Sequence, residues 1–192
     1  MIDQMSHPPG SSDKQRPAAF LDRDGVLNID HGFIHKPEQL QWIEGAPEAV
    51  RLLNDAGYFV IVVTNQSGVA RGYFDEAAVR SLHAVMQDRL AQYGAHIDAF
   101  YFCPHHPEGT VKALAVRCLC RKPKPGMLEQ AARDWPIDKR NSFLIGDKVD
   151  DMAAAAAFDI RGFKFDSSTA SLMALVRRAI AERSPAQDRP SS

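Results

Sequence analysis

The sequence alternates short apolar runs with segments of helical spacing, and this alternation limits the possible folds more than any other feature. Each apolar run is short enough for a buried strand. The predicted strands are residues 18–22, 58–64, 99–102, 142–146 and 160–165. The predicted helices are residues 47–56, 75–93, 125–135, 150–156 and 169–181. Strand and helix in repeated alternation predict an α/β fold with a doubly wound parallel sheet.

The length of 192 residues favours one domain with a substantial core. We expect this domain to span residues 18–183. Residues 1–17 and 184–192 lack periodicity and are rich in Pro, Ser and charged residues, so we expect a disordered N-terminal extension and a disordered tail. The segments 23–46 and 103–123 are too short to form a separate cap domain.

Charge and hydropathy exclude several classes of protein. Lys and Arg total 23 against 24 for Asp and Glu, without a dense basic run, so the electrostatic pattern of a nucleic-acid binder is missing. Residues 1–17 contain no apolar core of a secretory signal, and no apolar stretch approaches the length that spans a membrane. We therefore expect a cytoplasmic monomer that acts on a small molecule, with neither nucleic acid nor membrane as partner.

Two acids stand where the first predicted strand ends. Asp22 and Asp24 lie two residues apart and are followed by Gly25. Because the carboxyl ends of parallel strands face the ligand crevice, one carboxylate can act as a nucleophile and the other as a proton donor. Taken alone, the segment also fits a solvated turn, in which Asp and Gly are common.

Two later strand ends carry groups that suit phosphate and a divalent cation. Residues 64–72 offer a hydroxyl, an amide and exposed backbone N–H groups, which can bind phosphate oxygens, although a plain loop would read the same way. Residues 146–151 supply a further acid cluster whose hard oxygen ligands favour Mg²⁺. Asp150 or Asp151 could instead only cap a helix N-terminus.

The long loop 103–123 exceeds the usual length of a connection and contains all three cysteines. An odd number of cysteines in one loop argues against a disulfide framework and favours metal ligation. The set Cys103, His105, Cys118 and Cys120 has the Cys₃His composition of a closed structural zinc site. His106 is a neighbouring alternative ligand, and three unligated thiols are the other interpretation. The remaining histidines that we considered are expected on the surface or on helices, namely His31, His35, His83 and His96.

These motifs together resemble the haloacid dehalogenase (HAD) superfamily of phosphotransferases over about residues 18–166. The resemblance is carried by residues 22–25, 64–66, Lys122 and residues 146–151. Within the superfamily, residues 30–32, 103–105 and 118–123 resemble the D-glycero-D-manno-heptose-1,7-bisphosphate 7-phosphatases and their relative, the histidinol-phosphatase domain. The pattern of this group selects His105 as the zinc ligand.

The resemblance implies a Mg²⁺-dependent phosphatase that works through an aspartyl-phosphate. Asp22 would be the nucleophile and Asp24 the general acid and base. Mg²⁺ would be held by Asp22, the Asp24 backbone carbonyl and Asp147. Thr64, Asn65 and Lys122 would stabilise the transferring phosphoryl oxygens, and Arg121 would recognise the substrate. The residues expected to line the sugar site are Asp30, His31, Gly32, Phe33, Gln66, Ser67 and Lys148.

The implied reaction is removal of the 7-phosphate from a heptose 1,7-bisphosphate, a step towards nucleotide-activated heptose for bacterial surface polysaccharide. Histidinol-phosphate phosphatase is the closest alternative, since it has the same chemistry on another ester. A nucleic-acid 3′-phosphatase would need a basic channel. A zinc-loop interaction module without activity is the alternative from a different class, and the intact set of acids speaks against it.

Overall fold

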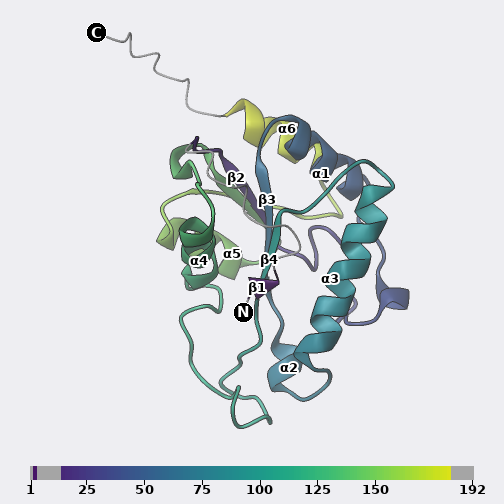
Figure 1. The fold of residues 1–192 in the computed structure, drawn as a ribbon, viewed down its shortest axis with the longest axis vertical. Coiled ribbons are helices and arrows are strands. Elements are labelled where there is room, and N and C mark those ends of the chain that lie inside the picture. The colour runs from purple at the N-terminus through teal and green to yellow at the C-terminus, as the bar shows by residue number, and fades with distance from the viewer. Residues whose placement is uncertain (1, 4–13, 183–192) are drawn as a thin grey trace.

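The predicted parallel sheet stands at the centre of the molecule in the computed structural model, which describes residues 2–3 and 14–182 (Figure 1). The strand order is β1-β4-β3-β2-β5-β6. The bounds are Ile2–Asp3 for β1, Ala18–Leu21 for β2, Phe59–Asn65 for β3, Ala99–Cys103 for β4, Phe143–Gly146 for β5 and Arg161–Lys164 for β6. The five strands β2 to β6 run parallel, and β1 pairs antiparallel with β4 at the edge.

Helices cover both faces of the sheet, so the fold has three layers (Figure 1). One face carries α1 (Ala46–Asp55), α3 (Glu76–Ala91) and α6 (Leu172–Ala181), and the other carries α4 (Gly126–Asp134) and α5 (Val149–Ala157). A short helix, α2 (Ser67–Ala70), follows β3 directly, and the 3-10 turns are η1 (Pro37–Gln39) and η2 (Lys139–Asn141). No helix within the described residues is both long and apolar enough to cross a lipid bilayer.

The alternating direction of strand side chains builds one apolar core on each face of the sheet. On β2, Ala19 and Leu21 join the core beneath α1, α3 and α6, whereas Ala18 and Phe20 join the core beneath α4 and α5. All four residues are almost completely buried. This two-sided burial explains why the predicted strands read as continuous apolar runs instead of alternating with polar residues.

The strand order reverses its direction of growth at β2. From β2 the chain adds β3 and β4 on one side, and it then returns to place β5 and β6 on the other side. The carboxyl ends of β2 and β5 are therefore neighbours, with Leu21 paired to Ile145. Open α/β sheets bind ligands at such a switch point, so topology alone marks this edge as the functional one.

The structure agrees with the predicted parallel sheet and with the five predicted helices, whose ends differ by a few residues. Asp75 caps α3, because its side chain accepts a hydrogen bond from the Ala78 N–H. The sequence pattern did not predict α2 and β1. Within the predicted disordered extension, residues 2–3 form β1 and Arg16 forms a bridge with Ile137. Residues 1, 4–13 and the predicted tail lie outside the described residues.

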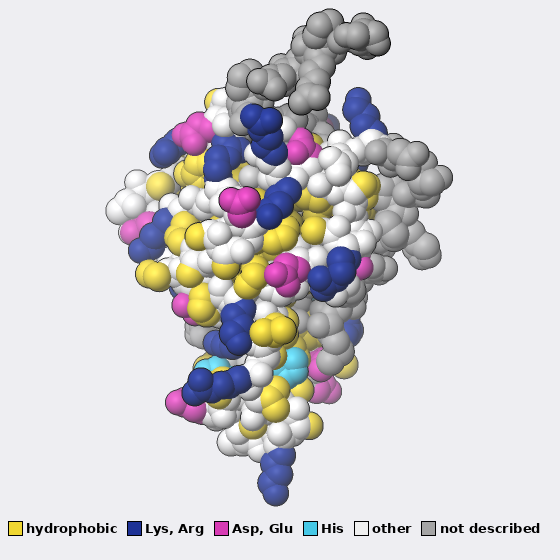
Figure 2. All heavy atoms as spheres, turned by 90° about the vertical axis from the view of Figure 1, so that its left-hand side faces the viewer, with side chains coloured by type: hydrophobic (Ala, Val, Ile, Leu, Met, Phe, Trp, Pro, Cys, Tyr) yellow, Lys and Arg dark blue, Asp and Glu magenta, His cyan; other side chains and the backbone are white. Residues whose placement is uncertain are grey.

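The face that is covered by α4 and α5 carries a mixed surface (Figure 2). Lys and Arg side chains alternate with Asp and Glu over the part of the chain that this view describes, and no continuous basic stripe crosses it. This distribution matches the near-neutral composition, which has a formal net charge of −1.

A pH-dependent contact fastens the start of β4. His96 Nε2 lies 3.5 Å from Asp98 Oδ1, and Asp98 Oδ2 accepts a 2.7 Å hydrogen bond from the Val60 N–H. The hydrogen bond between His96 and Asp98 raises the pKa of His96 above its ordinary value. A raised pKa in the folded state stabilises the fold below the unfolded pKa, and this stabilisation disappears as the pH rises through the folded pKa.

His96→Gln is therefore expected to destabilise the protein at about pH 5.5 and to be nearly neutral at about pH 8.5. The difference should stay below about 1 kcal/mol because the His96 side chain is half exposed. Urea unfolding of both proteins at the two pH values measures it. If the difference in unfolding free energy between the parent and His96→Gln is not smaller at the higher pH, the stabilising contact of His96 with Asp98 is contradicted.

Candidate active site at the sheet switch point

The carboxyl ends of β2, β3 and β5 border a cavity of about 300 Å³. Its lining is strongly polar and comes from segments far apart in the sequence. The lining residues are Asp22, Asp24, Asp30, Gly32, Phe33, Thr64, Asn65, Gln66, Ser67, Gly68, Arg121, Lys122, Lys148, Asp150 and Asp151. The separate strand ends that the sequence analysis singled out thus face one space.

Two of the predicted site residues do not line this cavity. His31 lies on the exposed loop after β2, where its Nε2 is 3.1 Å from Gln41 Oε1. Asp147 borders an adjoining hollow, together with Gly25 and Asp30. The zinc-type residues form a separate cluster in the long loop.

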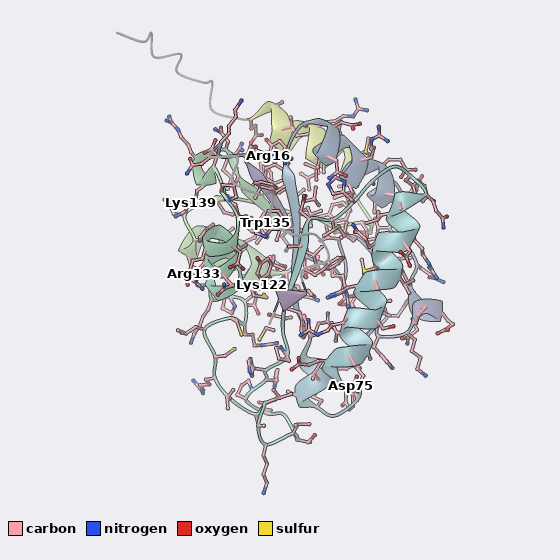
Figure 3. The ribbon with its side chains drawn as sticks, viewed as in Figure 1. Arg16, Asp75, Lys122, Arg133, Trp135 and Lys139 are labelled. Carbon is pink, nitrogen blue, oxygen red and sulfur yellow. The ribbon has the colours of Figure 1, made fainter. Side chains whose placement is uncertain are left out.

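The ammonium group of Lys122 is the central charge of the site, and its side chain is only 2% exposed. Lys122 Nζ lies 3.0 Å from Asp22 Oδ1 and 2.5 Å from Asp151 Oδ1, and it donates a 2.8 Å hydrogen bond to the Val63 carbonyl. The ammonium therefore makes two ion pairs and one hydrogen bond inside the protein. Figure 3 shows Lys122 at the lower end of the sheet, where the long loop returns.

Burial and charge act against each other in this cluster. Burial raises the pKa of Asp22 to about 6, even though the Lys122 ammonium lowers it. Burial also disfavours the charged form of Lys122, but the carboxylates of Asp22 and Asp151 outweigh it and raise the pKa of Lys122. The lysine therefore stays charged, and Asp22, with its pKa of about 6, is still mostly ionised at pH 7.

Three carboxylates of this region can together hold a cation. Oxygens of Asp22, Asp147 and Asp151 lie within 4.8 Å of one another. Asp147 Oδ1 is buried and finds no hydrogen-bond partner among the described residues. Gly25 has φ +89°, and a Cβ there would collide with the Asp147 carboxylate, so this glycine leaves room for the acid. A crowded set of hard oxygens with an orphaned buried oxygen fits Mg²⁺.

The carboxylate of Asp24 accepts hydrogen bonds from the side chains of Arg23, Asn28 and Gln66. Arg23 Nε and Nη2 donate to its two carboxylate oxygens at 3.1 and 2.9 Å, Asn28 Nδ2 donates at 2.9 Å and Gln66 Nε2 at 2.9 Å. Burial tends to raise the pKa of Asp24, but the Arg23 guanidinium and the hydrogen bonds from Asn28 and Gln66 together outweigh burial, so the pKa lies below its ordinary value. The plane of this carboxylate is therefore fixed by the protein.

Residues at the end of β3 form hydrogen bonds with Gln66 and with the backbone of Lys122, which also line the cavity. Thr64 Oγ1 accepts a 2.9 Å hydrogen bond from Gln66 Nε2. The Asn65 side chain donates to the Lys122 carbonyl at 3.0 Å and accepts from the Lys122 N–H at 3.1 Å. Asn65 therefore clamps the backbone that carries the central lysine, a role for its side chain that the sequence analysis did not foresee.

The mouth of the cavity is formed by the loop after β2 and the start of α5. Lys148 Nζ lies 3.2 Å from Asp30 Oδ2 and bridges these two segments in a solvent-exposed contact. Phe33, at φ 54°, packs edge-on against Tyr73 with ring centroids 4.8 Å apart. Arg121 Nη1 donates a 3.3 Å hydrogen bond to the His105 carbonyl, which ties the arginine to the long loop.

The long loop gathers its four predicted metal ligands. Cys103, His105, Cys118 and Cys120 each offer one ligand atom, and these atoms lie within 4.8 Å of one another. The three cysteines are free thiols, with Sγ to Sγ distances of 3.2 to 3.5 Å. The hydrogen bond with Cys103 lowers the pKa of Cys120 to about 5. His106 is not part of this cluster, and its Nε2 lies 3.5 Å from Arg71 Nη2.

Two residues of the site make contacts that were not predicted from the sequence. Asp151 caps α5 by accepting the Lys148 N–H at 3.0 Å, as expected, but its other oxygen binds Lys122. His83 does lie on a helix, α3, yet it is fully buried and contacts Arg23. Asp151 could have been found from its position beside Asp147 after a strand, whereas no sequence signal pointed to His83.

Comparisons with known proteins agree with this geometry. A family model described as HAD-hydrolase-like matches residues 119–180. The chain is 52% identical to a D-glycero-beta-D-manno-heptose-1,7-bisphosphate 7-phosphatase of Rhodopseudomonas palustris over 156 residues, covering 81% of this chain and 87% of the relative. It is 46% identical to the protein of that name in Escherichia coli K12 over 147 residues, covering 77% of each chain.

A solved structure is similar as well. The D,D-heptose 1,7-bisphosphate phosphatase from B. bronchiseptica, crystallised with magnesium and phosphate, has a TM-score of 0.72 and 31% identity, covering 86% of this chain and 99% of that chain. A protein with a similar fold therefore binds both magnesium and phosphate.

Lys122→Met tests how much the ion pairs of Lys122 with Asp22 and Asp151 contribute to stability. Removing the ammonium leaves two buried carboxylates without compensation, and we expect the free energy of unfolding to fall by about 3–5 kcal/mol. Denaturant unfolding without added Mg²⁺ measures this loss. Lys124→Met, two residues further on at an exposed position, is the matched control and should stay within about 0.5 kcal/mol of the parent. Equal stabilities of the two variants would refute the central place of Lys122.

Proposed function

Because the chain belongs to the D-glycero-beta-D-manno-heptose-1,7-bisphosphate 7-phosphatase family, we propose that it removes the 7-phosphate from a D-glycero-D-manno-heptose 1,7-bisphosphate. The high identity over most of the chain supports this substrate over histidinol phosphate, the alternative considered from the sequence. The observation that carries the chemistry is the convergence of Asp22, Asp24 and Lys122 on one cavity beside a cluster of carboxylates. A cytoplasmic location and a monomeric state remain predictions from the sequence.

In the proposed reaction Asp22 attacks the phosphorus of the 7-phosphate and forms an aspartyl-phosphate. Asp24 would enter this step protonated, because the arriving anionic phosphate disfavours a second negative charge beside it. As the bond from phosphorus to the sugar oxygen breaks, Asp24 gives this proton to that oxygen. Asp24 then takes a proton from the water that cleaves the aspartyl-phosphate and releases inorganic phosphate. Dividing a slow ester hydrolysis into two displacements lowers each barrier.

The surrounding groups of the chain compensate the charge that develops. Lys122 Nζ already lies 3.0 Å from the Asp22 carboxylate, so it can follow the transferring oxygens. The Thr64 hydroxyl and the Asn65 backbone N–H would bind the same oxygens. Asp22, Asp147 and the Asp24 backbone carbonyl would hold Mg²⁺, whose charge lets the anionic phosphate approach the carboxylate.

The far end of the substrate would meet the mouth of the cavity. Arg121 is a candidate for the second phosphate, since a guanidinium fork matches phosphate oxygens in pairs. Lys148 can exchange its exposed contact with Asp30 for a substrate oxygen. The sugar hydroxyls would face the other expected residues of the sugar site, namely Gly32, Phe33, Gln66 and Ser67.

We further propose that Cys103, His105, Cys118 and Cys120 hold one structural zinc ion. The set has Cys₃His composition and no open position, as in structural sites. Such an ion would brace the loop directly before Arg121 and Lys122, so its effect on the reaction would be indirect.

Asp22→Asn tests the nucleophile. We expect kcat for heptose bisphosphate to fall by about four powers of ten or more, because an amide does not form the acyl phosphate. Phosphate release and labelling of the enzyme by radioactive substrate phosphate measure the effect. Asp55→Asn, the same change at an exposed position of α1, is the control and should keep full activity. Retained turnover of Asp22→Asn, or a preference of the parent for histidinol phosphate, would overturn the proposal.

Metal analysis tests the zinc assignment. Gently purified protein is expected to contain about one zinc per chain, and Cys118→Ser to contain almost none, with a lower melting temperature. His106→Gln is the matched control, because His106 is the histidine beside the cluster, and it should keep its zinc. Loss of zinc from His106→Gln, or its absence from the parent, would reject the proposed ligand set.

A further inference from the structure

We propose that Arg23 and His83 are positioning residues, which hold the carboxylate of Asp24 in the orientation that proton transfer to the leaving sugar oxygen requires. This inference rests on the proposed phosphatase function and deepens it. It starts from two buried polar side chains that the proposed reaction does not use directly.

Arg23 is a fully buried guanidinium in the loop that follows β2. Its Nε and Nη2 bind the two oxygens of Asp24, and Nη2 also donates a 2.8 Å hydrogen bond to the Ile34 carbonyl. The guanidinium group therefore binds both oxygens of Asp24 and connects this residue to the loop at the mouth of the cavity. Planar two-point contacts of this kind fix direction as well as distance.

His83 supports this guanidinium from the middle of α3. It is fully buried, and its Nε2 lies 3.4 Å from Arg23 Nη1. Since arginine only donates hydrogen bonds, the Nε2 atom is the acceptor in this contact. The His83 ring stacks on Phe100, with ring centroids 4.3 Å apart and an angle of 14° between the planes. Phe102 packs edge-on against the same ring, with centroids 6.0 Å apart. These contacts fix the plane of the ring.

The hydrogen bonds of Asp24 show which donors can hold its carboxylate in place once the substrate is bound. An ionised carboxylate has about four acceptor directions. Arg23 uses two of them, Asn28 one and Gln66 one. Only Gln66 among these three donors lines the cavity. When the leaving oxygen arrives it must replace the Gln66 contact, and Arg23 with Asn28 then keeps the carboxylate in place.

Burying an ion pair such as that of Arg23 with Asp24 is costly, and an apolar core residue between Asp24 and α3 would cost the fold less. The arrangement is therefore better explained by the reaction than by stability. Proton transfer depends on alignment, and a displacement of about 1 Å can cost about a hundredfold in rate. A sugar oxygen is a poor leaving group and needs the proton from Asp24, whereas 4-nitrophenolate leaves without one.

The test compares kcat/KM for the heptose bisphosphate with kcat/KM for 4-nitrophenyl phosphate. This quantity reports the step in which the leaving group departs, and the ratio of the two values does not depend on the amount of folded enzyme. His83→Leu removes the acceptor and should lower the ratio of sugar to aryl ester about tenfold to a hundredfold. His83→Gln keeps an acceptor and should restore most of the ratio.

Met86→Ala is the control for a purely structural effect. Met86 is buried on the same helix within the apolar core, so its truncation should lower stability without changing the ratio. Arg23→Lys is a second variant in case His83→Leu does not fold, and it should lower the ratio because one ammonium cannot replace the two-point grip.

The outcomes separate the two proposals. A parent enzyme that hydrolyses neither ester refutes the phosphatase function itself. An active parent whose ratio is unchanged in His83→Leu and in Arg23→Lys, or is lowered equally by Met86→Ala, refutes the positioning role. A lowered ratio that His83→Gln restores supports it.

Discussion

The buried ion pairs of Lys122 are the interaction on which the rest of the site depends. One ammonium, almost without solvent contact, forms ion pairs with both Asp22 at the end of β2 and Asp151 at the start of α5. Without it, two acids from different strand ends could not share a low-dielectric space, because each would repel the other. The same lysine that makes the cluster stable is also the cation nearest to the proposed nucleophile, so folding and proposed chemistry share one charge.

The position of this lysine is itself determined by the long loop and by β3. Asn65 binds the backbone of Lys122 on both its N–H and its carbonyl, and the Gln66 N–H donates to the Cys103 carbonyl at 2.8 Å. The loop also packs on α2, where the Val111 N–H donates to the Ala70 carbonyl at 2.9 Å. Contacts of the backbone therefore connect the cysteine cluster, the short helix and the end of β3 that is proposed to bind phosphate. Through these contacts the proposed structural ion would influence the reaction.

The elements of the fold that local sequence determines were predictable. The strands are buried on both faces and read as continuous apolar runs, and Asp75 has the residue type and position of a helix cap. The residues missed by the analysis owe their structure to distant partners. α2 has only four residues and is held by contacts with the long loop, including the Ala70 N–H to the Pro104 carbonyl. β1 exists only because β4 offers an edge.

For the proposed site, the sequence by itself determined the chemistry available at each strand end: paired acids after β2, a hydroxyl and amides after β3, and further acids after β5. It also showed four metal-type ligands in one loop. Only the tertiary structure decided which of these groups touch. The pairing of Lys122 with Asp151, the clamp of Asn65, and the support of Asp24 by Arg23 and His83 all join residues that are distant in sequence or ambiguous in role. Local patterns encode the direction of side chains along one element, whereas the packing of elements against one another sets the distances between them.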